Sequence, residues 1–509
     1  MKFILLSDRR EKISVGAKNL VCLYYDSWND YSYITTFSLY FIDDNGQRHP
    51  IGDVKIGFKG QKSSISTYEK ILELSNGKTF DSLPDNFFSL ATDVVFYIRI
   101  MELPKEAREF ILDGLNDVVY KPGFFSKFRE ESVFKVSLMR NREETIIKDQ
   151  FKRVLDGKPP LTDFRFSFVR PERENMGEIC LDFYVSAYSR PSTNIHALIG
   201  RNGVGKTTLL NEMVKSFIDE NYDDGEFYSL EYYPFHIIKN KLDRKYFGHL
   251  IVVSFSVFDP FIPNSNELKQ YSYIGLKESD NRLKSPEDYF KKDFWESFHE
   301  CRSFIAKKER WLNAIKNLES DNNFAEMELS RLMDENIKEA YVLETIRKMS
   351  SGHASVLLII TQLVARVDEK TLVLLDEPES HLHPPLLSAF IRALSDLLNN
   401  RNAIAIIATH SPVVLQEVPK SCVWKIERTG KRVDPFRLEI ETFGENVGVL
   451  TREVFGLEVT KSGFHKILEE KVNAGGSYDL ILSEFEEQLG AEARILLKTL
   501  IKIRDSKSE

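Results

Sequence analysis

The sequence predicts an α/β fold built on a mostly parallel β-sheet. Short apolar runs such as "TLVLL" (371–375) and "AIAIIA" (403–408) have the length and composition of buried strands. Between them, residues 385–398 show the apolar spacing of a helix. Strands that alternate with helices form largely parallel sheets with both faces covered. We therefore expect such a core over residues 160–455, with a helical insertion at about 260–345.

Residues 1–155 predict an α+β accessory domain. The segments "YSYITTFSLYFI" (31–42) and "DVKIGF" (53–58) are rich in β-branched and aromatic residues, and Asp-Asn-Gly between them supplies a turn. One helix is predicted over 103–120, where Pro104 suits the first helical position.

The core is expected to begin after a linker, "DGKPPLTD" (156–163). Strands are predicted at 179–188, 194–200 and 249–255, and a helix at 205–221. These elements continue the alternation of strand and helix that defines the predicted sheet.

The insertion and the end of the chain are predicted to be helical. Within the insertion, residues 321–341 form the clearest amphipathic piece. Residues 456–509 read as a helical tail. No segment of the chain shows an internal repeat.

Composition indicates a globular protein of the cytoplasm that contacts no membrane. The chain has 509 residues, of which 42% are hydrophobic and 29% charged. Its apolar runs are far shorter than the roughly 18 residues that a membrane span needs, and charge at Asp8 comes too early for a signal peptide. The cysteines form no C-x-x-C pair, so no cysteine-based zinc site is expected; they are Cys22, Cys180, Cys301 and Cys422.

A net charge of −8 argues against a surface covered with phosphate-binding cations. The stretch "IIKNKLDRKYF" (237–247) could still form a local basic groove, although a solvated basic loop is the simpler interpretation.

A phosphate-binding loop is predicted between the strand at 194–200 and the helix at 205–221. The sequence "GRNGVGKT" fits G-x-x-x-x-G-K-[ST], in which glycines let the backbone wrap phosphates. Lys206 would meet phosphate oxygens, and Thr207 would offer its hydroxyl to Mg²⁺. The residues predicted to bind nucleotide here are Gly200, Arg201, Asn202, Gly203, Val204, Gly205, Lys206, Thr207 and Thr208.

Polar residues that follow two later strands supply the expected catalytic groups. Asp376 and Glu377 end the strand in "TLVLLDEPE", where Asp376 would hold Mg²⁺ and Glu377 would orient the attacking water. After the strand in "AIAIIATHSP", His410 could sense the γ-phosphate. Acids that only cap the next helix are the alternative, which the preceding P-loop disfavours.

Two loop histidines, His381 and His383, suggest a metal site superficially, as do His353 and His410. Their i, i+2 spacing lacks the i, i+4 pattern of a helical zinc pair, and no cysteine joins them. Packing of this loop beneath the nucleotide is therefore the favoured interpretation.

Taken in order, the P-loop, "SSGH" (350–353), "LLDEPE" and "ATHSP" resemble the ATP-binding cassette (ABC) superfamily. The stretch "DEPESHLHP" resembles its SMC, RecF and OLD branch rather than its transporters. The resemblance implies an ABC ATPase core that uses ATP and Mg²⁺. It also implies head-to-tail homo-oligomers, in which the serine–glycine turn of one chain contacts ATP on the P-loop of another. The residues that would do so are Ser350, Ser351 and Gly352.

The sequence departs from the family pattern at two places. The signature turn, Met349 to His353, has serine and histidine where transporters usually have glycine and glutamine. The glutamine expected after the second core strand is missing, and "VVSFSVFDPF" (252–261) offers only Ser254 and Ser256.

Less constrained segments, including "ETFGENVGVLTREVFGLEV" (441–459), resemble ATPases of bacterial anti-phage systems, closest to the Septu and retron-associated PtuA family. That resemblance implies an HNH nuclease partner and leaves contact with DNA or retron nucleic acid open. A RecF-like DNA-repair ATPase and an OLD- or PARIS-type ATPase with a Toprim partner remain alternatives. A self-contained nuclease is disfavoured, because residues 477–509 contain no D-x-D.

Overall fold

We describe a computed structural model of the chain. It covers all residues except 8–10, 12, 15, 28–32, 64, 76–77, 141–143, 145, 158–160, 175, 234–235, 255–269, 279–281, 286–291, 335, 462 and 507–509. Parts of the predicted linker and insertion, and Ser256 of the second departure from the family pattern, lie outside the described residues.

The N-terminal part is a six-stranded sheet with short helices. Strand order is β5-β1-β2-β3-β4-β6, and β3 pairs with β4 across the predicted turn. The strands are β1 (Lys2–Leu6), β2 (Leu20–Tyr25), β3 (Thr36–Ile42), β4 (Arg48–Phe58), β5 (Thr79–Phe80) and β6 (Phe87–Ala91). The helices are α1 (Thr67–Leu74), α2 (Val94–Glu102), α3 (Lys105–Gly114), α4 (Pro122–Phe128) and α5 (Lys152–Leu155), with π-helical turns at Phe134–Leu138 and Ile146–Phe151.

A seven-stranded sheet of order β13-β12-β14-β15-β9-β16-β17 forms the centre of the molecule. All its pairs are parallel except the β16–β17 hairpin, which confirms the predicted mostly parallel core. Its strands are β9 (Ile195–Ile199), β12 (His249–Ser254), β13 (Tyr271–Ile274), β14 (Thr371–Asp376), β15 (Ile404–Thr409), β16 (Val423–Thr429) and β17 (Arg432–Phe436).

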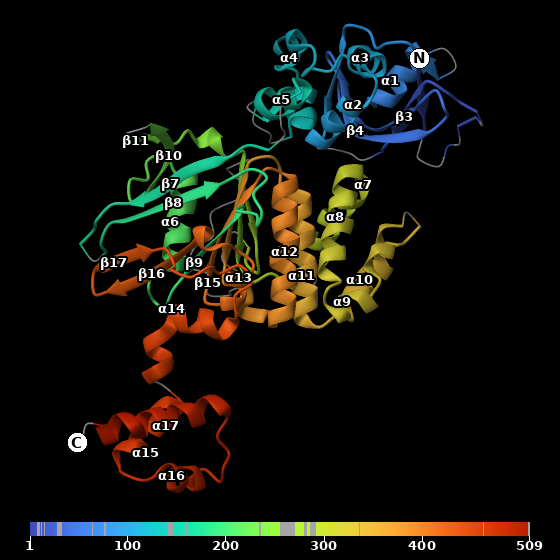
Figure 1. Ribbon diagram of the computed structural model, residues 1–509. Coiled ribbons are helices and arrows are strands. Elements are labelled where there is room, and N and C mark those ends of the chain that lie inside the picture. The colour runs from blue at the N-terminus through green and yellow to red at the C-terminus, as the bar shows by residue number, and fades with distance from the viewer. Residues whose placement is uncertain are drawn as a thin grey trace.

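Side chains alternate between two hydrophobic cores on opposite faces of this sheet. Ile407 and Leu375 face the helical side, whereas Ile406 and Leu374 face the other. Figure 1 shows helices α7, α8, α11 and α12 on the first side and α6 with a second sheet on the other. Those helices are α6 (Lys206–Ile218), α7 (Trp295–Ser303), α8 (Ile305–Leu318), α11 (Ser351–Arg366) and α12 (Pro384–Asn400).

The second sheet is antiparallel, with the order β11-β10-β7-β8. Its strands are β7 (Phe164–Arg170), β8 (Ile179–Val185), β10 (Glu226–Tyr233) and β11 (His236–Lys241). The strand predicted at 179–188 therefore belongs to this sheet and not to the parallel one. The basic stretch at 237–247, for which a loop was favoured, instead begins in the edge strand β11 and continues through a 3-10 turn at Arg244–Tyr246.

Two predicted helices are interrupted. The helix expected over 103–120 ends at Gly114, because Asn116 has a positive φ of 52°. The piece at 321–341 is divided into α9 (Asn322–Glu326), a 3-10 turn at Leu329–Met333 and α10 (Glu339–Arg347), with Glu328 at a φ of 46°. Positive φ does not fit a helix of L-residues, so the chain changes direction at both points.

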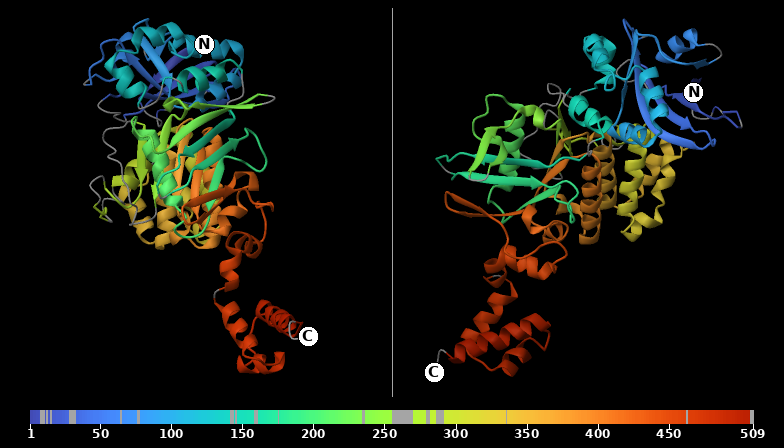
Figure 2. Two further views of the ribbon diagram at one scale, coloured as in Figure 1. Left: turned by 90° about the vertical axis from the view of Figure 1, so that its left-hand side faces the viewer. Right: turned by 45° about the horizontal axis from the view of Figure 1, so that its top comes forward.

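The end of the chain is helical, as predicted. After the short helix α13 (Pro412–Gln416) and the β16–β17 hairpin, helix α14 (Val447–Lys461) leads away from the core. It is followed by α15 (Phe464–Asn473), α16 (Tyr478–Glu484) and α17 (Ala491–Ser506). The last three share a small core of their own that includes Leu468, Ile481 and Leu497. Both views in Figure 2 show them at the end of the molecule opposite to the N-terminal sheet.

Buried charges join the N-terminal part to the central sheet. The carboxylate of Asp93, 4% exposed, lies 2.7 Å from Arg310 on α8 and 2.7 Å from Arg401 beyond α12. Arg401 also pairs with Asp368 and Glu369. Although burial raises the pKa of Asp93, the two guanidiniums outweigh it and hold that pKa well below its ordinary value.

This cluster predicts a pH dependence of stability. In this cluster the carboxylates of Asp93, Asp368 and Glu369 face the guanidiniums of Arg310 and Arg401. Burial raises the pKa of Glu369 to about 8, against the ordinary 4.5, even though Arg401 lowers it. The folded state thus holds this proton more tightly than the unfolded state. We expect the resulting stability to be full below pH 4.5 and to be lost as the pH rises through 8.

The change that tests this is Glu369→Gln, which keeps the neutral shape and removes the titration. The loss of unfolding free energy between pH 5 and pH 9, measured by urea denaturation, should shrink by on the order of a few kcal/mol, since one pKa unit is about 1.4 kcal/mol. Equal slopes for the two proteins would contradict the assignment.

Among the described residues, no helix combines the length and apolar character that crossing a bilayer requires.

Candidate nucleotide-binding site

The P-loop connects the end of β9 to the start of α6. Gly203 and Gly205 have φ angles of 79° and 101°, in the region that favours glycine. A Cβ on Gly200 would lie 2.3 Å from the carbonyl oxygen of Ile426 on the neighbouring strand β16. The glycines therefore meet specific steric demands, and the loop leads into the N-terminus of α6, where backbone N–H groups favour an anion.

Lys206 is held close to the P-loop backbone. Its side-chain nitrogen donates to the carbonyl oxygens of Gly200 (3.0 Å) and Arg201 (3.3 Å). The residue is 5% exposed. Burial lowers the pKa of Lys206 to about 8, against the charges of Glu377, Asp376 and Glu379, which raise it. A triphosphate would add negative charge beside this amine and stabilise its protonated form.

Thr207 and Asp376 lie together although 169 residues separate them. The Thr207 hydroxyl donates to Oδ1 of Asp376 at 3.1 Å. A hydroxyl and a carboxylate are the hard oxygen ligands that Mg²⁺ prefers. The pair predicted to hold magnesium is thus brought together, with a donor set that fits the ion.

Glu377 follows β14 in a strained conformation. Its φ of 46° is unusual for a residue with a side chain, and such strain gathers at functional sites. The side chain is 39% exposed, so its carboxylate reaches solvent. This position suits a group that must contact a water molecule.

His410 lies between Lys206 and Glu377. Its Nε2 is 2.7 Å from the Lys206 nitrogen and 3.3 Å from Oε1 of Glu377. Burial and the neighbouring Lys206 charge lower the pKa of His410, while Glu377 raises it. A neutral ring can accept from Lys206 through Nε2 or donate to Glu377 through that atom, but not both at once.

Glu379 is a residue of this site that the sequence did not identify. Its Oε1 accepts hydrogen bonds from the Thr409 hydroxyl (2.9 Å) and from the backbone N–H of His410. It therefore fixes the turn that carries His410. Glu379 is the third acid in "DEPES", after the two acids that end the strand. Its spacing from them does not predict which residues it contacts.

Ser254 occupies the end of β12, beside the catalytic strand. It is in register with Asp376 and is 2% exposed. The serine thus stands next to the predicted magnesium ligand, where the sequence lacks the expected glutamine.

The signature turn forms the start of α11. Ser350 is the N-cap residue, and its hydroxyl accepts from the backbone N–H of His353. Ser351 is exposed and Gly352 partly so. The contacts of Ser350 are thus within its own turn, whereas Lys206, Thr207, Asp376, Glu377 and His410 are linked to one another.

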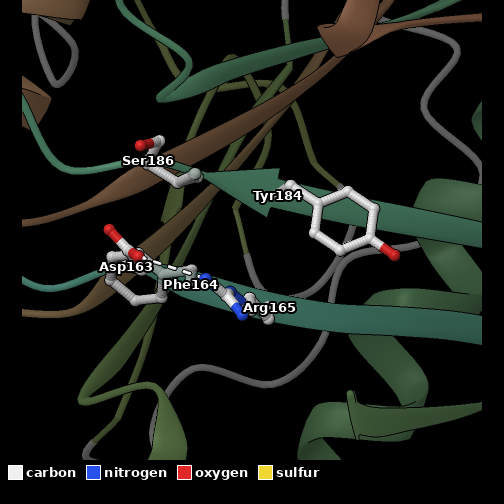
Figure 3. Close-up of a pocket in the computed structure, with 6 residues that line it drawn as sticks. Asp163, Phe164, Arg165, Tyr184 and Ser186 are labelled. Atoms are coloured by element: carbon white, nitrogen blue, oxygen red, sulfur yellow. Dashed lines mark ion pairs between the residues drawn. The ribbon is translucent and has the colours of Figure 1, made fainter. Parts of the chain in front are cut away.

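A cavity of about 400 Å³ lies elsewhere (Figure 3). It is lined by the start of β7 and the end of β8, where Asp163 and Arg165 form an ion pair at 3.5 Å. The end of β8 leads towards the start of β9, whereas the P-loop follows the end of β9. This cavity is therefore separate from the nucleotide site.

The chain is similar to several known proteins. Residues 214–416 match the family described as "AAA domain, putative AbiEii toxin, Type IV TA system". Similar solved structures include cbiO1 from Clostridium perfringens, part of the ABC transporter complex cbiONQ (16% identity, 62% of this chain and 96% of that one, TM-score 0.29). Another is the SMC head domain from Thermotoga maritima (12% identity, 54% and 100%, TM-score 0.30).

A much stronger similarity extends over nearly the full chain. Protein ea59 of Escherichia phage lambda is 45% identical over 523 aligned residues, which cover 98% of each protein. This chain therefore belongs to the same family as protein ea59 of phage lambda.

Proposed function

We propose that the chain hydrolyses ATP at a site shared between two copies arranged head to tail. The observation that carries the proposal is the connected set of Thr207–Asp376, Lys206–His410 and His410–Glu377 contacts. These contacts unite a phosphate-binding loop, two strand-end acids and a polar residue from the adjacent strand.

Each side chain has a defined task in this proposal. Lys206 leaves the loop carbonyls to bind the β- and γ-phosphates, and Thr207 and Asp376 hold Mg²⁺, which neutralises charge on the phosphates. Glu377 orients the attacking water and accepts its proton. His410 contacts the γ-phosphate and, when the phosphate leaves, returns to Glu377 and Lys206.

The second copy is needed because one chain carries two anion-binding helix starts. The N-terminus of α6 follows the P-loop, and that of α11 carries Ser350, Ser351 and Gly352. Each helix N-terminus offers backbone N–H groups and a partial positive charge to a phosphate. Exposed Ser351 is free to face ATP on another subunit.

Mixing two inactive variants tests the shared site. Lys206→Ala removes the P-loop amine, and Ser351→Arg blocks the signature turn with a bulky cation. Alone, each variant should lack ATPase activity. In an equimolar mixture with subunit exchange, half of the pairs are mixed and each has one intact site, so roughly a quarter of wild-type activity should return. If every site lies within one chain, no activity returns.

We further propose that the nucleotide state of this assembly controls a nuclease partner, of the HNH type, in defence against phage. The support is the resemblance of residues 441–459 and of the signature helix to anti-phage ATPases. A neighbouring reading frame for an HNH protein would favour this role. A Toprim neighbour would favour an OLD- or PARIS-type system, and a replication gene would favour DNA repair.

A further inference from the structure

A second group of ligand side chains lies outside the nucleotide-binding set. Asp321, His353 and His383 each offer one ligand atom, and these atoms all lie within 4.8 Å of one another. Asp321 is the N-cap of α9, His353 lies in the first turn of α11, and His383 is the N-cap of α12. Three separate helix starts therefore converge on one point.

The distances suit ligands of a common ion. Nε2 of His353 lies 3.1 Å from Oδ1 of Asp321, and Nε2 of His383 lies 3.6 Å from Oδ2. Ligands that are about 2.0–2.1 Å from a tetrahedral ion lie about 3.3 Å apart. Both distances are within a few tenths of an ångström of that value, and they end on the two different oxygens of the carboxylate.

Hydrogen bonding alone does not account for His383. The 3.6 Å separation from Asp321 exceeds the normal range of an N–H···O hydrogen bond. The ring nevertheless directs Nε2 towards the carboxylate and lies at 60° to the ring of His353, with 5.8 Å between the ring centroids. Two imidazoles therefore face one carboxylate, but only that of His353 lies within hydrogen-bonding distance of it. Metal ligands are arranged in this way.

The charge of the group also favours a cation. The side chains of Asp321 and His353 are each only 7% exposed. A cation beside these buried side chains would compensate the charge of the carboxylate.

Ser350 can hold the ring of His353 in the orientation that a metal requires. Its hydroxyl lies 2.6 Å from Nδ1 of His353. When Nδ1–H donates to this hydroxyl, Nε2 keeps its lone pair and points at Asp321. Metal-binding histidines almost always donate their other ring N–H in this way.

We propose that Asp321, His353 and His383 bind a divalent transition-metal ion. Zn²⁺ suits two imidazoles and one carboxylate best, with water as the fourth ligand. His383 is half-exposed, so an ion can enter from solvent. This site differs from the one expected for Mg²⁺ at Thr207 and Asp376, and it needs no cysteine.

The ion would connect the signature turn to the catalytic strand. Ser350 and His353 belong to the start of α11, while His383 follows β14 and the short turn at Pro378–His381. One ion joining them would hold the surface that carries Ser351 in a fixed orientation to Glu377. Metal binding itself does not depend on ATP hydrolysis, so the two proposals can fail separately.

Metal titration of nucleotide-free, untagged, chelator-treated protein tests the site. We expect one equivalent of Zn²⁺ to bind in competition with a chromophoric chelator, and Co²⁺ to give the visible absorption of a four-coordinate site. Millimolar Mg²⁺ should not displace either ion. Binding that stays far below one equivalent, or displacement by Mg²⁺, would overturn the proposal.

Variants locate the bound ion. His383→Ala changes a half-exposed side chain, which favours folding, and should weaken Zn²⁺ binding by more than about 100-fold. Ser350→Ala removes the hydroxyl beside Nδ1 of His353, together with the N-cap of α11, and should weaken binding about 10–100-fold. His49→Ala is the matched control, because His49 pairs with Asp43 at 2.9 Å on the N-terminal sheet. Unchanged binding in His383→Ala, or an equal loss in His49→Ala, refutes the site.

Discussion

Glu377→Gln is expected to lower the rate of ATP hydrolysis by at least about 100-fold while ATP binding persists, since general-base catalysis contributes about 10²–10⁴-fold. The glutamine has nearly the same shape but cannot accept the proton of the attacking water. Lys206, Thr207 and Asp376 are untouched, so the phosphates and Mg²⁺ keep their ligands. Bound ATP should therefore persist and stabilise the assembly of two copies.

Single-turnover hydrolysis and size-exclusion chromatography with ATP measure the two effects. Glu73→Gln is the control, because Glu73 lies on α1 with a side chain 63% exposed and pairs with the nearby Lys70 at 2.6 Å. It should behave as wild type. Hydrolysis by Glu377→Gln at the wild-type rate would show that Glu377 is not the catalytic base. If ATP does not change the elution volume of this variant, the shared site is contradicted.

The local parts of this site could be predicted from the sequence because each consists of residues that are contiguous along the chain. Gly203 and Gly205 adopt the positive φ angles that the P-loop pattern requires. Asp376 follows a strand of six residues, of which the first five are buried. Asp376 and Thr207 were each assigned to Mg²⁺ from their motifs, and the structure places the Thr207 hydroxyl 3.1 Å from Oδ1 of Asp376.

The second sheet was missed, although its signal is visible. In "ICLDFYV" of β8, buried residues alternate with partly exposed ones, whereas all five residues of β9 are buried. Alternation indicates a sheet with one solvated face, and continuous burial indicates a parallel sheet between layers. Both segments were nevertheless assigned to the same sheet.

The histidine–aspartate group could not be predicted, because its members share no spacing. Asp321, His353 and His383 lie on three segments whose meeting depends on how α9, α11 and α12 pack. His381 and His383 drew attention only as a pair, and the partner of His383 is 62 positions away. Tertiary packing decides such contacts.

Asp93→Ala is expected to lower the free energy of unfolding by about 3–5 kcal/mol, the range found when one partner of a buried ion pair is removed. The change removes the carboxylate that lies 2.7 Å from the buried guanidinium of Arg310. It also removes one of the carboxylates that pair with Arg401. Asp93 is also the N-cap of α2, accepting from the backbone N–H of Val95 at 3.0 Å. The residue thus stabilises its own helix and joins it to α8 and the end of α12.

Asp93→Asn separates these two contributions. Asparagine retains a capping oxygen but no charge, so it should be more stable than the alanine variant by about 1 kcal/mol, the usual value of an N-cap. Glu73→Ala, which removes an exposed ion pair, should change stability by less than about 1 kcal/mol. Urea denaturation of the full chain measures all three. If Asp93→Asn proved as stable as wild type, the charges of Arg310 and Arg401 would not need Asp93, and helix capping alone would explain its burial.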